Sequence, residues 1–430
     1  MSATETHRAV EAVWRIESSR LIAGLTRFVR DVGHAEDLAQ DALVAALERW
    51  PVTGIPDNPG AWLMATAKHR AIDQMRRSTR VDAKHAEIGV ALDAERDAEV
   101  DLLDAAIDDP VGDDLLGLIF MTCHPVLSSE GQVALTLRLL GGLSTPEIAR
   151  AFLVPEATVA QRIVRAKRTL AQAKVEFDVP RGSDLTARTP AVLGVIYLIF
   201  NEGYSATAGD AWTRPTLCDE ALRLGRILVG LAPQEREVHG LLALMELQAS
   251  RLRARSGPAG EPILLLDQDR AQWDQLLIRR GLAALDQAGA LGELGPYGLQ
   301  AAIAACHARA RIASETDWTL IAALYGALVA LSPSPVVELN RAVAVGMAVG
   351  PAPALAIADA LGSEGSLEQY YLLHAVRGDL LEKLGRFEEA AAEFDRGGTL
   401  TRNERERTIL LDRAAAARRQ SGAAADRPAS

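Results

Sequence analysis

The stretch from residue 143 to residue 170, LSTPEIARAFLVPEATVAQRIVRAKRTL, restricts the fold more than any other part of the chain. Ser144 or Thr145 can cap a helix there, and Pro146 stands where a first-turn proline is tolerated. A second helix start follows at Pro155, with apolar side chains at helical spacing after it. We therefore expect two short helices joined by a tight turn. The second should bury four apolar side chains against the first: Val159, Ile163, Ala166 and Leu170.

The opposite side of the second predicted helix has the chemistry of a DNA-reading surface. Glutamine can pair bidentately with adenine and arginine with guanine in the major groove, while neighbouring cations bind phosphates. An amphipathic helix with a solvated basic face shows the same residue types, so that interpretation stays open for this face alone. The residues expected to face DNA are Thr158, Gln161, Arg162, Arg165, Lys167 and Arg168.

Composition favours a helical protein of the cytoplasm. The chain is 49% hydrophobic but only 4% aromatic, which predicts an interior of Ala and Leu. No apolar run reaches the length of a membrane span, and the N-terminus lacks the apolar core of a signal peptide. The 3 cysteines are scattered, and no constellation of catalytic type stands out among the 8 histidines. We therefore expect no membrane partner, no metal or cofactor, and no enzyme activity.

The first 80 residues predict a group of amphipathic helices. The apolar spacing fits one or two helices over residues 9–31 and another, with an acidic stripe, over residues 34–50. A proline-rich loop at residues 51–59 precedes a basic helix suited to phosphates. An acidic stripe alone is usually a solvated helix face.

Three motifs in order resemble bacterial sigma factors of the extracytoplasmic-function (ECF) type. Two stretches resemble region 2 of these factors: Ala35-Glu36-Asp37-Leu38-x-Gln40-Asp41 and Trp62-Leu63-x-x-x-Ala67-x-x-Arg70-Ala71-x-Asp73-x-x-Arg76-Arg77. The Leu-Ser-x-x-Glu-Ile-Ala and Ala-Thr-Val-x-x-Arg-Ile-x-Arg-Ala-Lys blocks between residues 143 and 167 resemble region 4, which reads the minus-35 promoter element. His69 departs from the family pattern, which commonly has Asn at that position.

The resemblance implies an all-α fold with sigma region 2 at residues 8–80 and region 4, a helix-turn-helix, at residues 114–178. It also implies two partners, promoter DNA and core RNA polymerase, the latter through its β′ clamp helices and β flap. The polymerase-binding residues carried over are Asp37, Gln40, Asp41 and Leu43. The residues carried over to the minus-10 element are Trp62, Lys68, Arg70, Asp73, Arg76 and Arg77.

The net charge of −11 is unevenly distributed, because acidic residues crowd the predicted linker at residues 81–113. One interpretation is a solvated tether. The other is a nucleic-acid mimic that occupies the polymerase cleft or the RNA exit path.

Residues 181–425 continue as apolar helices punctuated by Gly and Pro, which predicts an α-solenoid or a helical bundle. Within it, Gly378-x-x-Leu381-x-x-x-Gly385-Arg386-Phe387-Glu388-Glu389-Ala390-x-x-x-Phe394 resembles a tetratricopeptide (TPR) repeat, with Phe394 filling the helix crossing. Residues 340–360 are a candidate second copy. The whole chain resembles the long factors of ECF group 42, whose appended domain is taken to regulate activity.

The segment at residues 201–228 is unusually polar and aromatic for a helical connector. It could line a pocket for a small-molecule or protein regulator, or it could form a hydrogen-bonded corner that docks the C-terminal domain. The candidate pocket residues are Asn201, Glu202, Tyr204, Trp212 and Arg214.

The predicted function is that of an alternative sigma factor whose C-terminal TPR-like domain modulates its activity. The alternative is a polymerase-independent helix-turn-helix regulator with a TPR-like sensor domain, and a weaker option is a TPR scaffold. The region 2 motifs favour the first prediction, because an operator-binding regulator needs neither the acidic block nor the basic helix.

Overall fold

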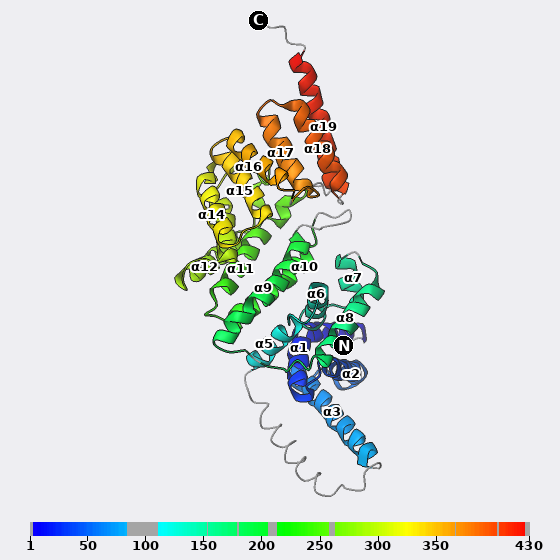
Figure 1. Ribbon diagram of the computed structural model, residues 1–430. Coiled ribbons are helices and arrows are strands. Elements are labelled where there is room, and N and C mark those ends of the chain that lie inside the picture. The colour runs from blue at the N-terminus through cyan, green and yellow to red at the C-terminus, as the bar shows by residue number, and fades with distance from the viewer. Residues whose placement is uncertain are drawn as a thin grey trace. The chain divides into compact units, whose positions relative to one another are not determined.

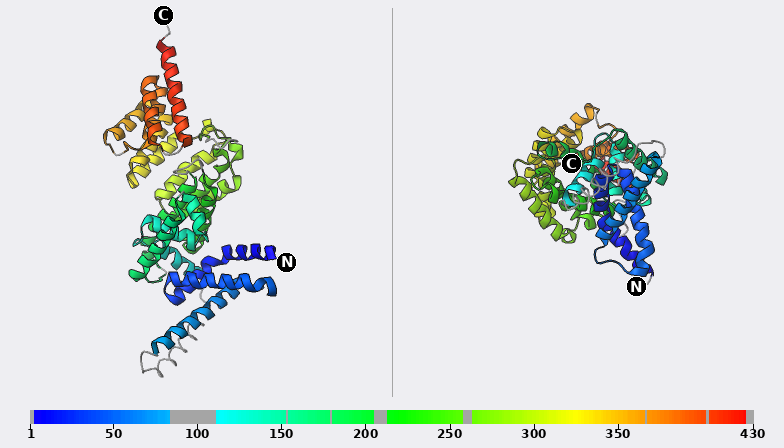
Figure 2. Two further views of the ribbon diagram at one scale, coloured as in Figure 1. Left: turned by 90° about the vertical axis from the view of Figure 1, so that its right-hand side faces the viewer. Right: turned by 90° about the horizontal axis from the view of Figure 1, so that it is seen from below.

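The computed structural model describes residues 3–83, 111–152, 154–178, 180–204, 213–257, 263–365, 367–401 and 404–425. These residues form α-helices, short 3-10 helices and connections, with no strand among them (Figures 1 and 2). The all-α prediction is confirmed. The chain divides into two compact units, residues 1–196 and residues 197–430. The predicted acidic linker falls largely outside the described residues.

The first unit begins with a three-helix group: α1 (Ala3–Val29), α2 (Val32–Thr53) and α3 (Pro59–Ala83). Asp31 caps α2, because its side chain accepts a hydrogen bond from the His34 backbone N–H at 2.7 Å. Leu25, Leu38 and Leu63, one from each helix, are at most 1% exposed in a shared core. That core fixes which faces of α2 and α3 meet solvent.

Four helices follow in the same unit: α5 (Val111–Thr122), α6 (Ser129–Leu139), α7 (Thr145–Phe152) and α8 (Glu156–Gln172). Before α7, the Ser144 backbone N–H and hydroxyl donate to Glu147 Oε2 at 2.8 and 2.7 Å, and the Glu147 N–H donates back to Ser144 Oγ at 3.4 Å. This capping box starts the first helix of the helix-turn-helix. The prediction for α8 is confirmed, because its four inner apolar residues are buried: Val159, Ile163, Ala166 and Leu170.

The rest of the chain is a succession of helices, most of which pack on their neighbours along the sequence, while α13 packs mainly on α11 (Figure 1). The α-helices are α9 (Ser183–Tyr204), α10 (Pro215–Leu231), α11 (Arg236–Ala249), α12 (Gln275–Ala290), α13 (Pro296–Arg309), α14 (Trp318–Leu331), α15 (Pro335–Ala348), α16 (Pro351–Ser363), α17 (Tyr371–Lys383), α18 (Phe387–Leu400) and α19 (Glu404–Ala425). Short 3-10 helices are η2 (Leu252–Arg255), η3 (Arg270–Gln272) and η4 (Ala313–Glu315).

The helix crossing predicted from the repeat-like spacing occurs between α17 and α18. A Cβ atom at Gly378 would lie 2.5 to 2.9 Å from the Phe394 ring, so only glycine permits this approach. Ala390 and Phe394 are fully buried there. A similar approach joins α15 to α16, where a Cβ atom at Gly346 would lie 3.2 Å from the Ala354 Cβ.

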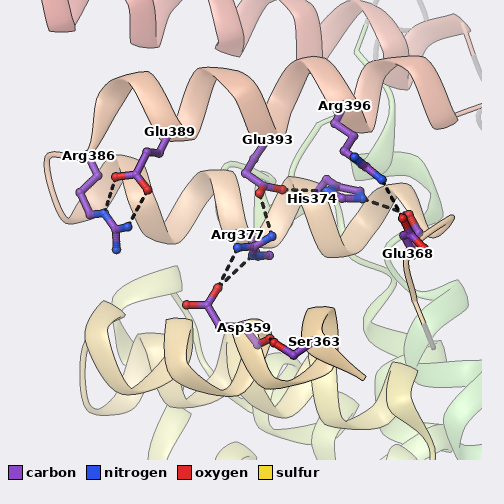
Figure 3. A network of polar contacts seen from close by, with 9 residues as sticks. All are labelled: Asp359, Ser363, Glu368, His374, Arg377, Arg386, Glu389, Glu393 and Arg396. Atoms are coloured by element: carbon purple, nitrogen blue, oxygen red, sulfur yellow. Dashed lines mark hydrogen bonds and ion pairs between the residues drawn. The ribbon is translucent and has the colours of Figure 1, made fainter. Parts of the chain in front are cut away.

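Polar side chains join α16, α17 and α18 (Figure 3). His374 Nδ1 lies 2.7 Å from Glu393 Oε2. Arg377 bridges Glu393 Oε1 at 2.7 Å and Asp359 Oδ1 at 2.9 Å. Because a carboxylate on each outer helix meets the same guanidinium, the network sets how the three helices lie against one another.

Helix α9 corrects one expectation. By length and composition it is the one helix among the described residues that could cross a membrane. From the sequence we expect no apolar run as long as a membrane span. Val192, Ile196 and Phe200 on α9 are buried, whereas Leu198 is exposed, so part of its apolar surface packs within the protein.

Candidate nucleic-acid interface

The outer face of α8 carries five of the six residues predicted to contact minus-35 DNA. Gln161, Arg165 and Arg168 are exposed, whereas Thr158 and Arg162 are half-buried. Apart from Arg168, these residues line a pocket of about 370 Å³ between α8 and the start of α6. The buried inner face of α8 packs into the protein and leaves this polar stripe facing outward, as a major-groove helix requires.

Lys167, the sixth predicted residue, lies elsewhere. Its Nζ forms an ion pair with Glu36 Oε2 on α2, and Arg138 Nε on α6 donates to Glu36 Oε1 at 2.7 Å. The Glu36 side chain is only 4% exposed. Burial alone would raise the pKa of Glu36, but the two cations outweigh it and hold that pKa below its usual value. In this structure the Lys167 side chain therefore joins α8 to α2 instead of facing outward.

The residues predicted to bind polymerase divide into two pairs along α2. Asp37 and Asp41 are exposed. Gln40 and Leu43 are half-buried, and they line a cavity of about 190 Å³ together with Arg138. Region 4 residues thus lie over part of the predicted polymerase-binding face.

The basic helix α3 places the predicted minus-10 residues in different environments. The Trp62 ring packs edge to face on the buried Trp50, with ring centroids 5.4 Å apart. Arg70 lies 3.5 Å from Asp41, but both side chains are more than a third exposed, so this ion pair is weak. Lys68 is half-buried and Asp73 exposed. The side chains of Arg76 and Arg77 fall outside the described residues.

Val164 is a candidate contact that the sequence reasoning missed. It is 65% exposed and lies on the same stripe of α8 as Gln161 and Arg168. An exposed apolar side chain beside the base-reading candidate Gln161 suits the methyl group of thymine. Its position three residues after Gln161 was the available signal.

The residues of the predicted regulatory pocket take part in separate sets of contacts. Arg214 Nη1 pairs with Glu202 Oε1, both nearly buried, and the Arg214 backbone N–H donates to the Gly203 carbonyl at 2.6 Å. These contacts form a hydrogen-bonded corner. Tyr204 instead accepts a hydrogen bond from Arg251 Nη2 at 2.5 Å. Asn201 is half-buried, and Trp212 lies outside the described residues.

The three cysteines are buried and unpaired. Burial raises the pKa of Cys123 to about 11 and that of Cys218 to about 12. Thiols held protonated in this way are inert as nucleophiles and are suited to packing.

Three family models match the chain: Sigma-70 region 2 over residues 15–81, Sigma-70, region 4 over residues 118–170, and a family of unknown function (DUF6596) over residues 188–289. An uncharacterized protein of Rhizobium meliloti (strain 1021) is 45% identical over 390 residues, which cover 90% of this chain and 91% of that protein. The probable ECF RNA polymerase sigma factor SigI of Mycobacterium tuberculosis, from strains CDC 1551 / Oshkosh and ATCC 25618 / H37Rv, is 28% identical over 173 residues. That match covers 40% of this chain and 58% of SigI. No solved structure matches the chain significantly.

Proposed function

Because this chain belongs to the ECF sigma factors and has a helical C-terminal extension, we propose that it recognises promoters through two DNA contacts, one from each sigma region. As a sigma factor it acts in transcription initiation with core RNA polymerase and promoter DNA. The finer assignment gives the minus-35 element to region 4 and the minus-10 element to region 2. The outer stripe of α8 carries this proposal, because Gln161 and Arg165 are exposed on a helix whose inner face is buried.

At the minus-35 element, the side chains on the outer face of α8 differ in the part of the DNA that each can bind. Gln161 suits adenine and Arg165 suits guanine, because each offers a bidentate match to one base edge. In this proposal Val164 meets a thymine methyl and Arg168 binds phosphate, and the exposure of both side chains on the outer face of α8 supports it.

At the minus-10 element, α3 would supply cations to the separated strand while Trp62, held against Trp50, would supply an aromatic edge. The exposed Asp37 and Asp41 on α2 are the proposed contacts to the β′ clamp helices. Region 4 would meet the β flap. We place the protein in the cytoplasm, where bacterial core polymerase works, and propose that it has no catalytic activity of its own.

The two DNA contacts require regions 2 and 4 to separate. The ion pairs from Glu36 to Lys167 and to Arg138 hold α8 and α6, respectively, close to α2. We infer that these ion pairs break on promoter binding, which would expose Gln40 and Leu43 to polymerase and Lys167 to DNA. The extension would modulate how readily this opening occurs.

Substitution of Arg165 by alanine tests the assigned base contact. In complexes of the protein with core polymerase, Arg165→Ala should weaken binding to a selected promoter by about 1 to 3 kcal/mol and relax the preference at one base pair. The control is Arg20→Ala, which removes an exposed arginine from a different helix, α1. It should leave the promoter affinity and the base preference unchanged. Unchanged affinity and sequence preference for Arg165→Ala would remove the proposed role of this residue.

A further inference from the structure

Buried carboxylates in this chain are matched by cations. In the second unit the Glu246 side chain, only 1% exposed, has Arg226 at 3.0 Å and Arg280 at 3.3 Å. Glu36 in the first unit has Arg138 and Lys167. Burying a charge is costly unless an opposite charge accompanies it, so this matching is expected.

Three arginines of the second unit gather around two aromatic rings. They are Arg251 just before η2, Arg255 at the end of η2, and Arg270 at the start of η3. The Cζ atoms of Arg251 and Arg270 lie 5.7 and 4.9 Å from the ring centroid of Trp273. Those of Arg251 and Arg255 lie 5.8 and 3.8 Å from the ring centroid of Tyr204. Arg251 thus shares one aromatic ring with each of the other two arginines.

The hydrogen bonds of Arg251 and Arg270 go to neutral oxygens. Arg251 donates to Tyr204 Oη, and Arg270 donates to the carbonyls of His307 and Ala310 at 2.5 and 2.7 Å and to Thr316 Oγ1 at 3.0 Å. Among the described residues, no carboxylate oxygen lies within 4.0 Å of a nitrogen of either arginine. Burial lowers the pKa of Arg270 and the charge of Arg251 lowers it further, whereas the more distant charge of Glu315 raises it; the guanidinium remains charged.

Polar atoms beside these arginines also lack partners. Trp273 Nε1, His307 Nδ1 and Arg270 Nε are buried without a hydrogen bond to any described residue. The Trp273 and His307 residues are only 3% and 7% exposed. Burial together with the charges of Arg251 and Arg270 lowers the pKa of His307 to about 3, so its ring adds no positive charge. Buried donors of this kind need an acceptor, and two adjacent guanidiniums need a negative charge.

We propose that Arg251, Arg270 and Trp273 bind a small-molecule oxyanion, a carboxylate or a phosphate group, in the C-terminal extension. Such a group accepts hydrogen bonds only and matches the planar fork of a guanidinium. Stacking on Tyr204 and Trp273 holds the arginines in place before the ligand arrives. A small ligand fits better than a nucleic-acid backbone, because Trp273 is buried and the arginines are half-buried. All three binding residues lie in the segment that matches the family of unknown function.

This site goes beyond the proposed sigma activity, and its binding can be measured without polymerase or DNA. We would titrate the purified full-length chain with inorganic phosphate and, separately, with benzoate, by calorimetry and thermal unfolding at constant ionic strength in chloride. We expect saturable binding and a raised Tm with one of the two oxyanions, and that result identifies whether phosphate or carboxylate is preferred. Benzyl alcohol, which lacks the charge, should give neither effect. No saturable response to either oxyanion up to about 50 mM, a range that covers millimolar ligands, would overturn the proposal.

Two variants locate the binding. Arg251→Gln should weaken it by about tenfold or more, because a charged donor becomes neutral. Tyr204→Phe keeps the ring but removes the hydroxyl that accepts from Arg251, and it should weaken binding less. Arg396→Gln, at a half-exposed arginine paired with Glu368, is the matched control and should bind like the intact chain. Circular dichroism checks that each variant folds. Intact-chain affinity in folded Arg251→Gln or, should that variant not fold, in Tyr204→Phe would contradict the site.

Discussion

Glu36 is the buried member of an acidic block whose neighbours Asp37 and Asp41 are exposed. Because its pKa is lowered in the folded state, the stability it contributes is present above its usual value of 4.5 and is lost as the pH falls through the folded pKa. Thermal unfolding would be measured at a series of pH values from 7 downward. At pH 7 the free energy of unfolding of Glu36→Gln should be lower than that of the intact chain by about 2 kcal/mol. The same variant should lose less stability on acidification than the intact chain. Asp37→Asn is the control, and equal acid sensitivity in all three proteins would contradict this account.

Val164 offers a second test at a single residue. Val164→Ala should weaken binding of the polymerase complex to a selected minus-35 element by about 1 kcal/mol if the side chain meets a thymine methyl. Stability should not fall, because alanine is the better helix former and the side chain is exposed. A promoter with uracil replacing thymine at each position in turn would locate the contact. Equal binding by both proteins at every position would remove Val164 from the interface.

What could be predicted at this scale was local. The buried face of α8 and the capping box at Ser144 follow from side-chain spacing within a few residues. The ion pair of Lys167 with Glu36 joins residues far apart in the chain, so no local pattern announces it. The same is true of Arg251, whose role depends on Tyr204 and Trp273 from other segments.

Among the helices, the α17–α18 crossing depends on the missing Cβ atom at Gly378. Gly378→Ala should destabilise the protein by about 1 to 3 kcal/mol, because the buried Phe394 ring has no room to move. Gly326→Ala, within α14, is the matched control, since nothing lies within 4 Å of its added Cβ. That control should gain up to about 1 kcal/mol from better helix propensity. Chemical denaturation measures both, and equal effects at the two positions would contradict the crossing as the cause.

Helix identity was predictable from periodicity, whereas the partner of each helix face was not. The family resemblance predicts that Trp62 contacts DNA, whereas its packing on Trp50 from α2 could not be predicted from the spacing of residues. The repeat-like spacing predicted the crossing at Gly378, because small residues and a filling aromatic recur at fixed distances. The polar network of Figure 3 uses Asp359, Arg377 and Glu393 from three helices, a combination that spacing alone does not reveal.

For the molecule as a whole, promoter recognition by an acidic protein depends on where its charges lie. The net charge of −11 would oppose DNA binding if it were uniform, but α8 concentrates its arginines on one outer stripe. We propose that the exposed acidic residues of α2, Asp37 and Asp41, meet the polymerase. We therefore propose that the chain binds the polymerase and the promoter at the same time, through different surfaces.

Run-off transcription with core polymerase freed of every sigma factor tests this claim most directly. A template pool from the protein's own genome should yield new transcripts with defined start sites only when the full chain is added, and the yield should fall with Arg165→Ala. A chain that binds duplex DNA but yields no transcript with core polymerase would contradict the account and favour an operator-binding regulator.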